Sequence, residues 1–173
     1  HEPKVMDRGD IYFMILSRFD DLGTLRSKIF RRDPVQAIQS FQKVFEAFSY
    51  NLLDNQSLHK LQKLETEKIP FITDEKKLEQ IYQISDIVDA FPQYQKWKKE
   101  QNWIDYGDMI INIWELIQQH KDILIELQTQ YKHVIVDEFQ DNNYALSKIV
   151  EKIAEPENSI TVVGDDDQCI YAF

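Results

Sequence analysis

Apolar residues recur at helical spacing through the first part of the chain, in segments that prolines or polar clusters separate. One helix is predicted to begin at Pro34 and to end near residues 53–55, because proline suits the first helical turn and a polar cluster follows. Its apolar positions repeat every three or four residues, which is typical of a face turned toward a core. These positions are Val35, Ile38, Phe41, Val44, Phe45 and Phe48.

A second helix is predicted to begin after an N-cap at Thr73 or Asp74. It is predicted to be interrupted at Pro92, since proline lacks the amide hydrogen that a helix interior needs. Tyr94 and Trp97 are assigned to a further helix after this interruption. Only four glycines occur in the whole chain, so the first part is predicted to be mostly helical.

The pattern changes after Trp103, where short strands are predicted between helices. The predicted elements are a helix entered through residues 105–108 with apolar positions Met109, Ile110, Ile113, Trp114 and Ile117, then a helix at 121–127, a strand at 133–136, a helix at 143–153 and a strand at 159–163. Both strands are β-branched runs that suit buried parallel strands, and both end in acidic residues. A helix joining two such strands is typical of a parallel βαβ unit, whose ligands bind beyond the carboxyl ends of the strands.

The sequence therefore predicts a mostly α fold with a small α/β remnant. The predicted division gives a helical part at residues 1–103 and an α/β part at residues 104–173.

Composition and charge narrow the classes of function. A hydrophobic content of 43 % with 12 % aromatics predicts a globular chain, and a net charge of −10 excludes a long-range positive field that would attract a polyanion. Cys169 is the single cysteine, which excludes an internal disulfide framework and a cysteine-based zinc cluster. No apolar run reaches the roughly 18 residues of a membrane-spanning helix. We therefore expect a cytoplasmic protein with no membrane partner.

Two neighbouring acids follow the first predicted strand. Asp137 can hold Mg²⁺ through its hard carboxylate oxygens, and Glu138 can orient and polarise an attacking water. An acid pair at a strand end can equally cap the next helix or face solvent, so both interpretations stay open for this pair alone. After the second strand comes Gln168, whose amide can contact a terminal phosphate. The alternative for Gln168 is a polar turn.

Two aromatic residues follow Gln168. Tyr171 and Phe173 alternate just beyond the second predicted strand and can stack on unpaired bases, at about 1–3 kcal/mol per base. The alternative is that both rings belong to a core.

Residues 134–141 and 163–173 resemble helicase motifs II and III of the UvrD/Rep/PcrA branch of superfamily 1, in the expected order. They read Val-Ile-Val-Asp-Glu-Phe-Gln-Asp and Val-Gly-Asp-Asp-Asp-Gln-Cys-Ile-Tyr-Ala-Phe. Residues 105–110 resemble the Asp-Phe-x-Asp-Leu-Leu element of this family, with Tyr106 and Met109 as departures. Cys169 stands where the family usually has serine, so we assign it no role.

The resemblance implies a RecA-like P-loop NTPase motor that hydrolyses ATP with Mg²⁺. It implies that Asp137 helps to hold Mg²⁺, that Glu138 activates the attacking water, and that Gln168 couples the terminal phosphate to DNA. It further implies that Tyr171 and Phe173 stack on bases of single-stranded DNA. The intact enzyme would then translocate on single-stranded DNA and unwind duplex junctions in DNA repair, recombination or replication.

By the same resemblance, residues 1–103 correspond to the helical insert subdomain 1B and residues 104–173 to the C-terminal part of motor domain 1A. Four basic residues of the insert are candidates for phosphate contacts or, alternatively, form a solvated basic turn: Arg26, Lys28, Arg31 and Arg32. The sequence contains no Gly-x-x-x-x-Gly-Lys-Ser/Thr loop. The isolated chain is therefore expected to be inactive without the other motor domains of the same polypeptide.

Two other functions stay open. One is the motor part of a helicase–nuclease or of a translocase that does not unwind DNA. The other is an inactive adaptor that binds protein.

Overall fold

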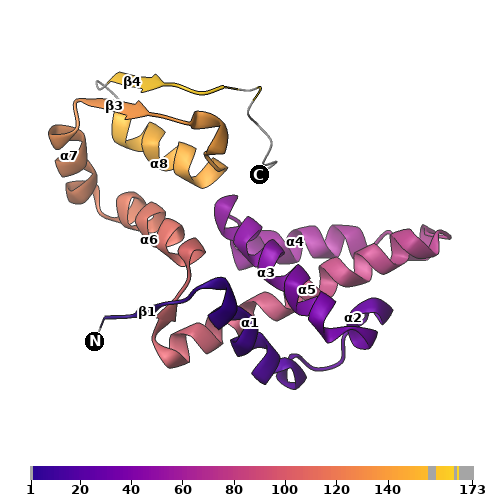
Figure 1. Ribbon diagram of the computed structural model, residues 1–173. Helices are drawn as coiled ribbons and strands as arrows, with labels where there is room; N and C mark the ends of the chain where they lie inside the picture. Colours follow the sequence, from indigo (N-terminus) through magenta and orange to yellow (C-terminus); the bar gives the residue numbers. More distant parts are fainter. Residues whose placement is uncertain (1, 156–158, 166, 168–173) are drawn as a thin grey trace. The chain divides into compact units, whose positions relative to one another are not determined.

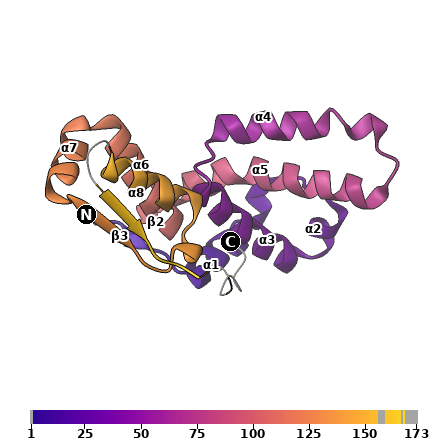
Figure 2. The ribbon, with the colours of Figure 1, turned by 90° about the horizontal axis from the view of Figure 1, so that it is seen from above.

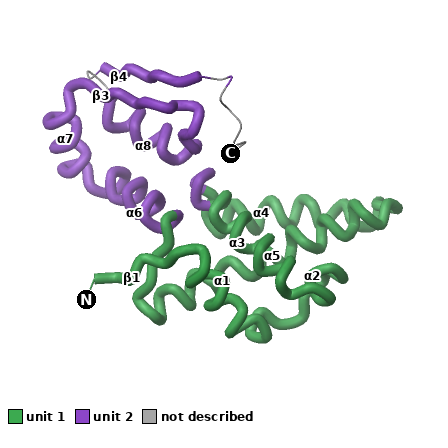
Figure 3. Tube along the Cα trace, viewed as in Figure 1, with its two compact units in different colours: residues 1–48, 53–106 green, residues 49–52, 107–173 purple. Residues whose placement is uncertain are grey.

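The structure is a computed structural model that describes residues 2–155, 159–165 and 167. Helices predominate and the strands are short, as the sequence predicts (Figure 1, and from above in Figure 2). The chain divides into two compact units: unit 1 comprises residues 1–48 and 53–106, and unit 2 comprises residues 49–52 and 107–173 (Figure 3). In the described part, no helix is both long and apolar enough to cross a membrane.

The elements up to residue 104 are β1 (Lys4–Val5), α1 (Arg8–Ser17), a 3₁₀ helix (Phe19–Leu22), α2 (Lys28–Arg32), α3 (Pro34–Tyr50), α4 (Asn55–Thr66), a 3₁₀ helix (Ile69–Phe71), α5 (Glu75–Gln101) and β2 (Trp103–Ile104). The elements that follow are α6 (Tyr106–Gln119), α7 (Lys121–Gln130), β3 (His133–Val136), a 3₁₀ helix (Phe139–Asp141), α8 (Tyr144–Ala154) and β4 (Ser159–Val162).

Most of the predicted stripe of α3 packs in the core of unit 1, but Val35 is 47 % exposed and lies outside the core. The chain enters α3 through Asp33, whose carboxylate accepts a hydrogen bond from the backbone amide of Gln36 at 3.0 Å, and Pro34 takes the first helical position. The ring of Phe45 stacks on that of Tyr94 from α5, with centroids 4.8 Å apart. The buried positions of α3 are Ala37, Ile38, Phe41 and Phe45. Helical periodicity thus predicted the face that packs in the core.

α5 runs unbroken for 27 residues, so the predicted interruption at Pro92 is wrong. Its N-cap is Asp74, as predicted. Proline inside a helix costs about 3 kcal/mol, because it removes one hydrogen bond and clashes with the preceding turn. The helix continues because Phe91, Tyr94 and Trp97, which lie on both sides of Pro92, are at most 4 % exposed in one core. Breaking the helix would expose this large apolar surface, which outweighs the local cost.

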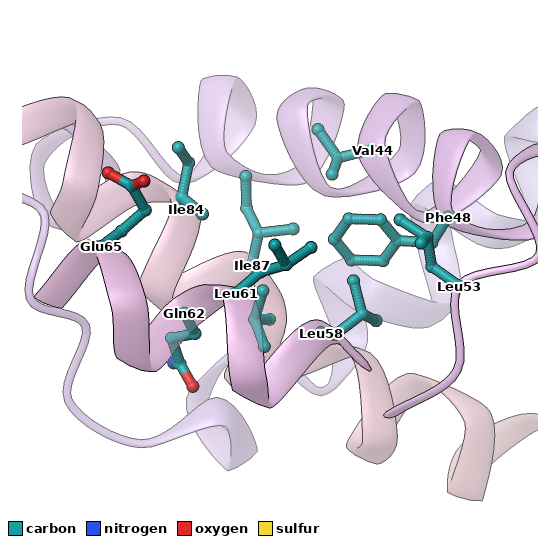
Figure 4. Close-up of a pocket in the computed structure, with 10 residues that line it drawn as sticks. Val44, Phe48, Leu53, Leu58, Leu61, Gln62, Glu65, Ile84 and Ile87 are labelled. Atoms are coloured by element: carbon teal, nitrogen blue, oxygen red, sulfur yellow. The ribbon is translucent and has the colours of Figure 1, made fainter. Parts of the chain in front are cut away.

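α4 lies alongside α5, and together with α3 these helices line an apolar pocket of about 260 Å³ (Figures 2 and 4). Lining residues include Val44 and Phe48 of α3, Leu58 and Leu61 of α4, and Ile84 and Ile87 of α5. Two of these side chains, Leu61 and Ile84, stay about half exposed. The pocket is therefore a shallow apolar surface of unit 1.

Two carboxylates of α5 fix the loop that leads into α2. Asp86 is 2 % exposed and accepts hydrogen bonds from the backbone amides of Arg26 and Ser27, at 2.9 and 2.8 Å. Glu79 accepts hydrogen bonds from the Ser27 hydroxyl and from two backbone amides of α2. Burial raises the pKa of Glu79, but these hydrogen bonds outweigh burial and hold the pKa below its usual value. Protein carboxylates thus satisfy the amide groups at the start of α2.

A buried ion pair lies where unit 1 ends. Nζ of Lys98 lies 2.6 Å from Oδ2 of Asp105, and the hydroxyl of Tyr94 donates a hydrogen bond to the same oxygen at 2.6 Å. The side chains of Lys98 and Asp105 are 5 % and 13 % exposed. Directly before Asp105, strand β2 lies parallel to β1 and pairs with it over two residues, which the sequence pattern did not predict. Asp105, the first acid of the segment that resembles a family element, is thus held inside unit 1.

The predicted βαβ unit is confirmed in unit 2. β3 and β4 pair in parallel, with His133 opposite Ser159 and Val136 opposite Val162, and α8 connects them (Figure 1). Asn143 caps α8 by accepting a hydrogen bond from a backbone amide of its first turn. The carboxyl ends of the two strands therefore lie at the same edge.

The prediction that these strands are buried is wrong for this chain. Ile135 of β3 is 68 % exposed, and all four residues of β4 are exposed. Parallel sheets are ordinarily covered on both faces, whereas among the described residues the covering helix α8 packs against β3 and β4 from one side. The β-branched residues of the other face remain in solvent.

Candidate active site at the ends of the parallel strands

The turns that follow β3 and β4 are tied together by backbone hydrogen bonds. Val136, the last residue of β3, pairs with Val162, the last residue of β4. Beyond them, the amide of Val163 donates to the carbonyl of Val136 at 2.8 Å, and the amide of Phe139 donates to the carbonyl of Val163 at 2.9 Å. The predicted acids therefore lie at the edge where parallel sheets bind ligands.

Asp137 and Glu138 are both exposed in the turn after β3. The backbone amide of Glu138 donates a hydrogen bond to Oδ1 of Asp137 at 3.0 Å, which orients the aspartate. Glu138 has φ 51° and ψ 44°, the left-handed region that residues with a Cβ seldom adopt. Such a conformation costs on the order of 1–3 kcal/mol and is concentrated at functional sites.

The side-chain amide of Gln140 joins the two turns. Its Nε2 donates to Oε2 of Glu138, and its Oε1 accepts a hydrogen bond from the backbone amide of Asp165 at 3.0 Å. Gly164 permits this approach, because a Cβ at that position would lie 2.6 Å from Oε1 of Gln140. Gln140 has no role in the sequence prediction. The available signal was its residue type, because a primary amide can donate and accept hydrogen bonds at once.

Three predicted site residues, Gln168, Tyr171 and Phe173, lie outside the described residues. Before them in the sequence, the backbone amide of Asp167 donates a hydrogen bond to Oδ1 of Asp165 at 3.0 Å. Their contacts with phosphate and with bases stay predictions.

The acids of this edge suit a divalent cation only together with oxygens from a substrate. Among the described residues, no group of three or more His, Cys, Asp or Glu side chains is placed to hold a metal ion. Mg²⁺ is usually held by one or two carboxylates together with water and substrate phosphates. The exposed carboxylate of Asp137, with Glu138 beside it, fits that pattern as a partial set of ligands.

Of the four basic candidates in unit 1, Arg26 is engaged within the protein. Its guanidinium forms ion pairs with Asp86 and Asp89. The hydrogen bond to Asp89 is the main reason why the pKa of Arg26 is raised. The other three candidates are exposed, and of these Arg31 also donates a hydrogen bond from Nη1 to the carbonyl oxygen of Leu25 at 3.2 Å. Both interpretations stay open for these three residues.

The chain matches the family model of the UvrD/REP helicase N-terminal domain over residues 11–173. YjcD of Bacillus subtilis is 36 % identical over 107 residues, which are 62 % of this chain and 13 % of that protein. The ATP-dependent DNA helicase PcrA of Leuconostoc citreum is 34 % identical over 87 residues, which are 50 % of this chain and 12 % of that protein. DNA helicase II of Haemophilus influenzae is 34 % identical over 80 residues, which are 46 % of this chain and 11 % of that protein.

The chain thus spans between 11 % and 13 % of the length of these relatives. The family match includes all of unit 2 and most of unit 1, with Asp137, Glu138 and Gln140 inside it. The chain belongs to the UvrD/REP helicase N-terminal domain family.

Proposed function

We propose that this chain is part of an ATP-dependent DNA helicase and that the turn at Asp137 and Glu138 is the catalytic edge of its ATP site. The observation that carries the proposal is a pair of exposed carboxylates at the carboxyl end of a parallel βαβ unit, in a chain of a helicase family. Two relatives that are named as DNA helicases support it. The proposed whole is a RecA-like P-loop NTPase motor, in which residues 104–173 belong to domain 1A and residues 1–103 to subdomain 1B.

Glu138 is the proposed catalytic base. Its carboxylate takes a proton from a water molecule while the water oxygen forms a bond to the terminal phosphorus of ATP. The bond from that phosphorus to the bridging oxygen breaks, and its electron pair leaves with ADP. Asp137 is the proposed ligand of Mg²⁺, which when bound neutralises negative charge on the phosphate oxygens.

The proposed link to DNA consists of Gln168, Tyr171 and Phe173. Gln168 would contact the terminal phosphate, and the two aromatic rings would stack on bases of single-stranded DNA, a contact that tolerates any sequence. Such local contacts suit a chain with a net charge of −10, which offers no long-range attraction to DNA. The intact protein would translocate on single-stranded DNA and unwind duplex junctions in repair, recombination or replication.

Residues 1–173 by themselves are expected to hydrolyse no ATP. The sequence contains no Gly-x-x-x-x-Gly-Lys-Ser/Thr segment, and the amides and lysine of such a loop cradle the phosphates in enzymes of this class. We propose that other domains of the same polypeptide supply these groups.

The test is ATP turnover by the full-length polypeptide that contains this chain, with and without single-stranded DNA. We expect DNA to stimulate turnover, and Glu138→Gln to lower kcat by at least about 100-fold, the usual contribution of a general base. Glu126→Gln is the matched control, because Glu126 is an exposed glutamate on α7 of the same unit. Turnover that is absent, or that is indifferent to Glu138→Gln, would refute the proposal and favour the adaptor.

A further inference from the structure

We propose that Gln140 is a positioning residue for Glu138 and transmits the position of the turn at residues 163–165 to that carboxylate. The proposal rests on the function proposed above for Glu138. Gln140 itself is not proposed to contact ATP. Gln140 would act through Glu138.

Both ends of the Gln140 side chain are used. Nε2 donates to Oε2 of Glu138, and Oε1 accepts from the backbone amide of Asp165. An amide is the required group, because the Glu138 side needs a donor and the Asp165 side needs an acceptor. A Cβ at Gly164 would lie 2.6 Å from Oε1, so a side chain at this position would displace the Gln140 amide.

The orientation of Glu138 depends on this contact because its surroundings do not otherwise confine its side chain. Glu138 is exposed, and an exposed carboxylate on two methylene groups has several rotamers. The hydrogen bond from Gln140 selects among them and occupies one carboxylate oxygen, which leaves the other oxygen for a water. A displacement of about 1 Å at a reacting group can lower a rate by about 100-fold.

The contact also gives the second turn an influence on the first. If the backbone amide of Asp165 moves, the Oε1 atom that it holds is pulled or released, and Nε2 at the other end of the same rigid amide moves with it. Gln168, the proposed phosphate contact, follows Asp165 by three positions in the sequence. A change at that segment would thus reach Glu138 through one side chain.

Two substitutions separate positioning from simple attachment of the turns. Gln140→Met keeps the length of the side chain and removes both hydrogen bonds. Gln140→Glu keeps an acceptor for the amide of Asp165 but replaces the donor facing Glu138 with a second carboxylate. We expect both variants of the full-length protein to lose about 10- to 100-fold in kcat for DNA-stimulated ATP turnover, with KM for ATP changed by less than about twofold.

Gly164→Ala perturbs the same contact from the opposite side. The added Cβ would lie 2.6 Å from Oε1 of Gln140, so the amide must shift. We expect a similar loss of kcat, and we expect the double variant with Gln140→Met to lose no more than the worse single variant, since both remove one contact. Gln130→Met is the matched control, because Gln130 is exposed at the end of α7, and it should keep the wild-type kcat.

The outcomes distinguish this inference from the function on which it rests. Absence of ATP turnover in the wild type, or turnover indifferent to Glu138→Gln, would refute the proposed function itself. If the wild type is active and Glu138→Gln abolishes activity, wild-type kcat in Gln140→Met or in Gln140→Glu would overturn the positioning role. A rise in KM with unchanged kcat would overturn it as well. If the Gln140 variants do not fold, as judged by circular dichroism, Gly164→Ala decides in the same way.

Discussion

Asp86 is the residue whose replacement should destabilise unit 1 most clearly. It is 2 % exposed on α5, and its two carboxylate oxygens accept hydrogen bonds from the amides of two successive residues, Arg26 and Ser27. Asp86→Asn keeps the shape of the side chain and replaces one of these oxygens with an NH₂ group. One of the two backbone amides then faces a donor in place of an acceptor.

The size of the effect follows from these contacts. A hydrogen bond to a charged acceptor contributes about 1.5–3 kcal/mol, and a buried amide that loses its acceptor carries a cost of about 1–3 kcal/mol. Ser27 is fully buried, so water cannot replace the lost acceptor there. We expect Asp86→Asn to lower the free energy of unfolding by about 3 kcal/mol.

Urea unfolding of residues 1–173 at pH 7 measures this change, followed by tryptophan fluorescence, to which the buried Trp97 contributes. With a denaturant slope of about 2 kcal/mol per molar urea, the midpoint should fall by about 1.5 M while the slope stays unchanged. Asp89→Asn is the matched control. Asp89 pairs with the same Arg26, but its side chain is 41 % exposed, so its loss should cost less than about 1 kcal/mol.

Equal midpoints for the two variants would refute the reasoning. That result would mean that burial of the carboxylate does not decide the strength of its hydrogen bonds at this loop. A changed slope for Asp86→Asn would instead show that the folded or unfolded state itself had changed in compactness.

Three further changes test other contacts of unit 1 in the same urea assay. The pKa of Glu79 is lower in the folded state than its unfolded value near 4.5. Its carboxylate therefore stabilises the fold at pH values above the unfolded pKa, and this stabilisation is lost as the pH falls through the folded pKa. The difference in unfolding free energy between the wild type and Glu79→Gln, about 1 kcal/mol at pH 7, should therefore shrink below pH 4.5, and a difference that grows in acid would contradict this. Lys98→Met removes the ammonium group that lies 2.6 Å from the carboxylate of Asp105 and should cost about 3–5 kcal/mol, whereas a variant as stable as the wild type would show that the pair contributes little. Pro92→Ala restores a donor inside α5 and should stabilise unit 1 by about 2 kcal/mol, because the local cost of about 3 kcal/mol outweighs the roughly 1 kcal/mol by which proline restricts the unfolded chain; an unchanged or lower midpoint would contradict this.

The elements that sequence could predict are those whose own pattern decides their structure. α3 has one apolar face, and its spacing predicted the helix and most of the residues that pack in the core, although Val35 is exposed and the buried Ala37 was not predicted. α1 was missed because residues 11–16 are apolar or aromatic without a helical period. Its available signal was the capping box formed by Asp7 and Asp10.

The elements that sequence could not predict depend on residues far along the chain. By local preference Pro92 predicts a helix break. The helix continues because the residues before and after Pro92 pack in the same hydrophobic core, which local preference does not show. Ile135 reads as buried because its run is β-branched, but its exposure depends on what covers the sheet.

The same distinction holds for the candidate site. The position of Asp137 and Glu138 after a parallel strand followed from the run of apolar residues before them, and the structure places them there. The contact of Gln140 with the turn at Asp165 depends on strand pairing and on the missing side chain of Gly164, 24 residues further on. Residue order alone does not show that these groups meet.

At Glu138 the left-handed backbone conformation sets the stability of the fold against the proposed chemistry. Glycine adopts this conformation without the penalty of a Cβ, which is about 1 kcal/mol or more for other residues. A library of variants selected only for resistance to heat should therefore accept glycine at residue 138, whereas selection for the proposed ATP turnover should reject it. At residue 138 the backbone conformation favours glycine, whereas the proposed reaction needs glutamate.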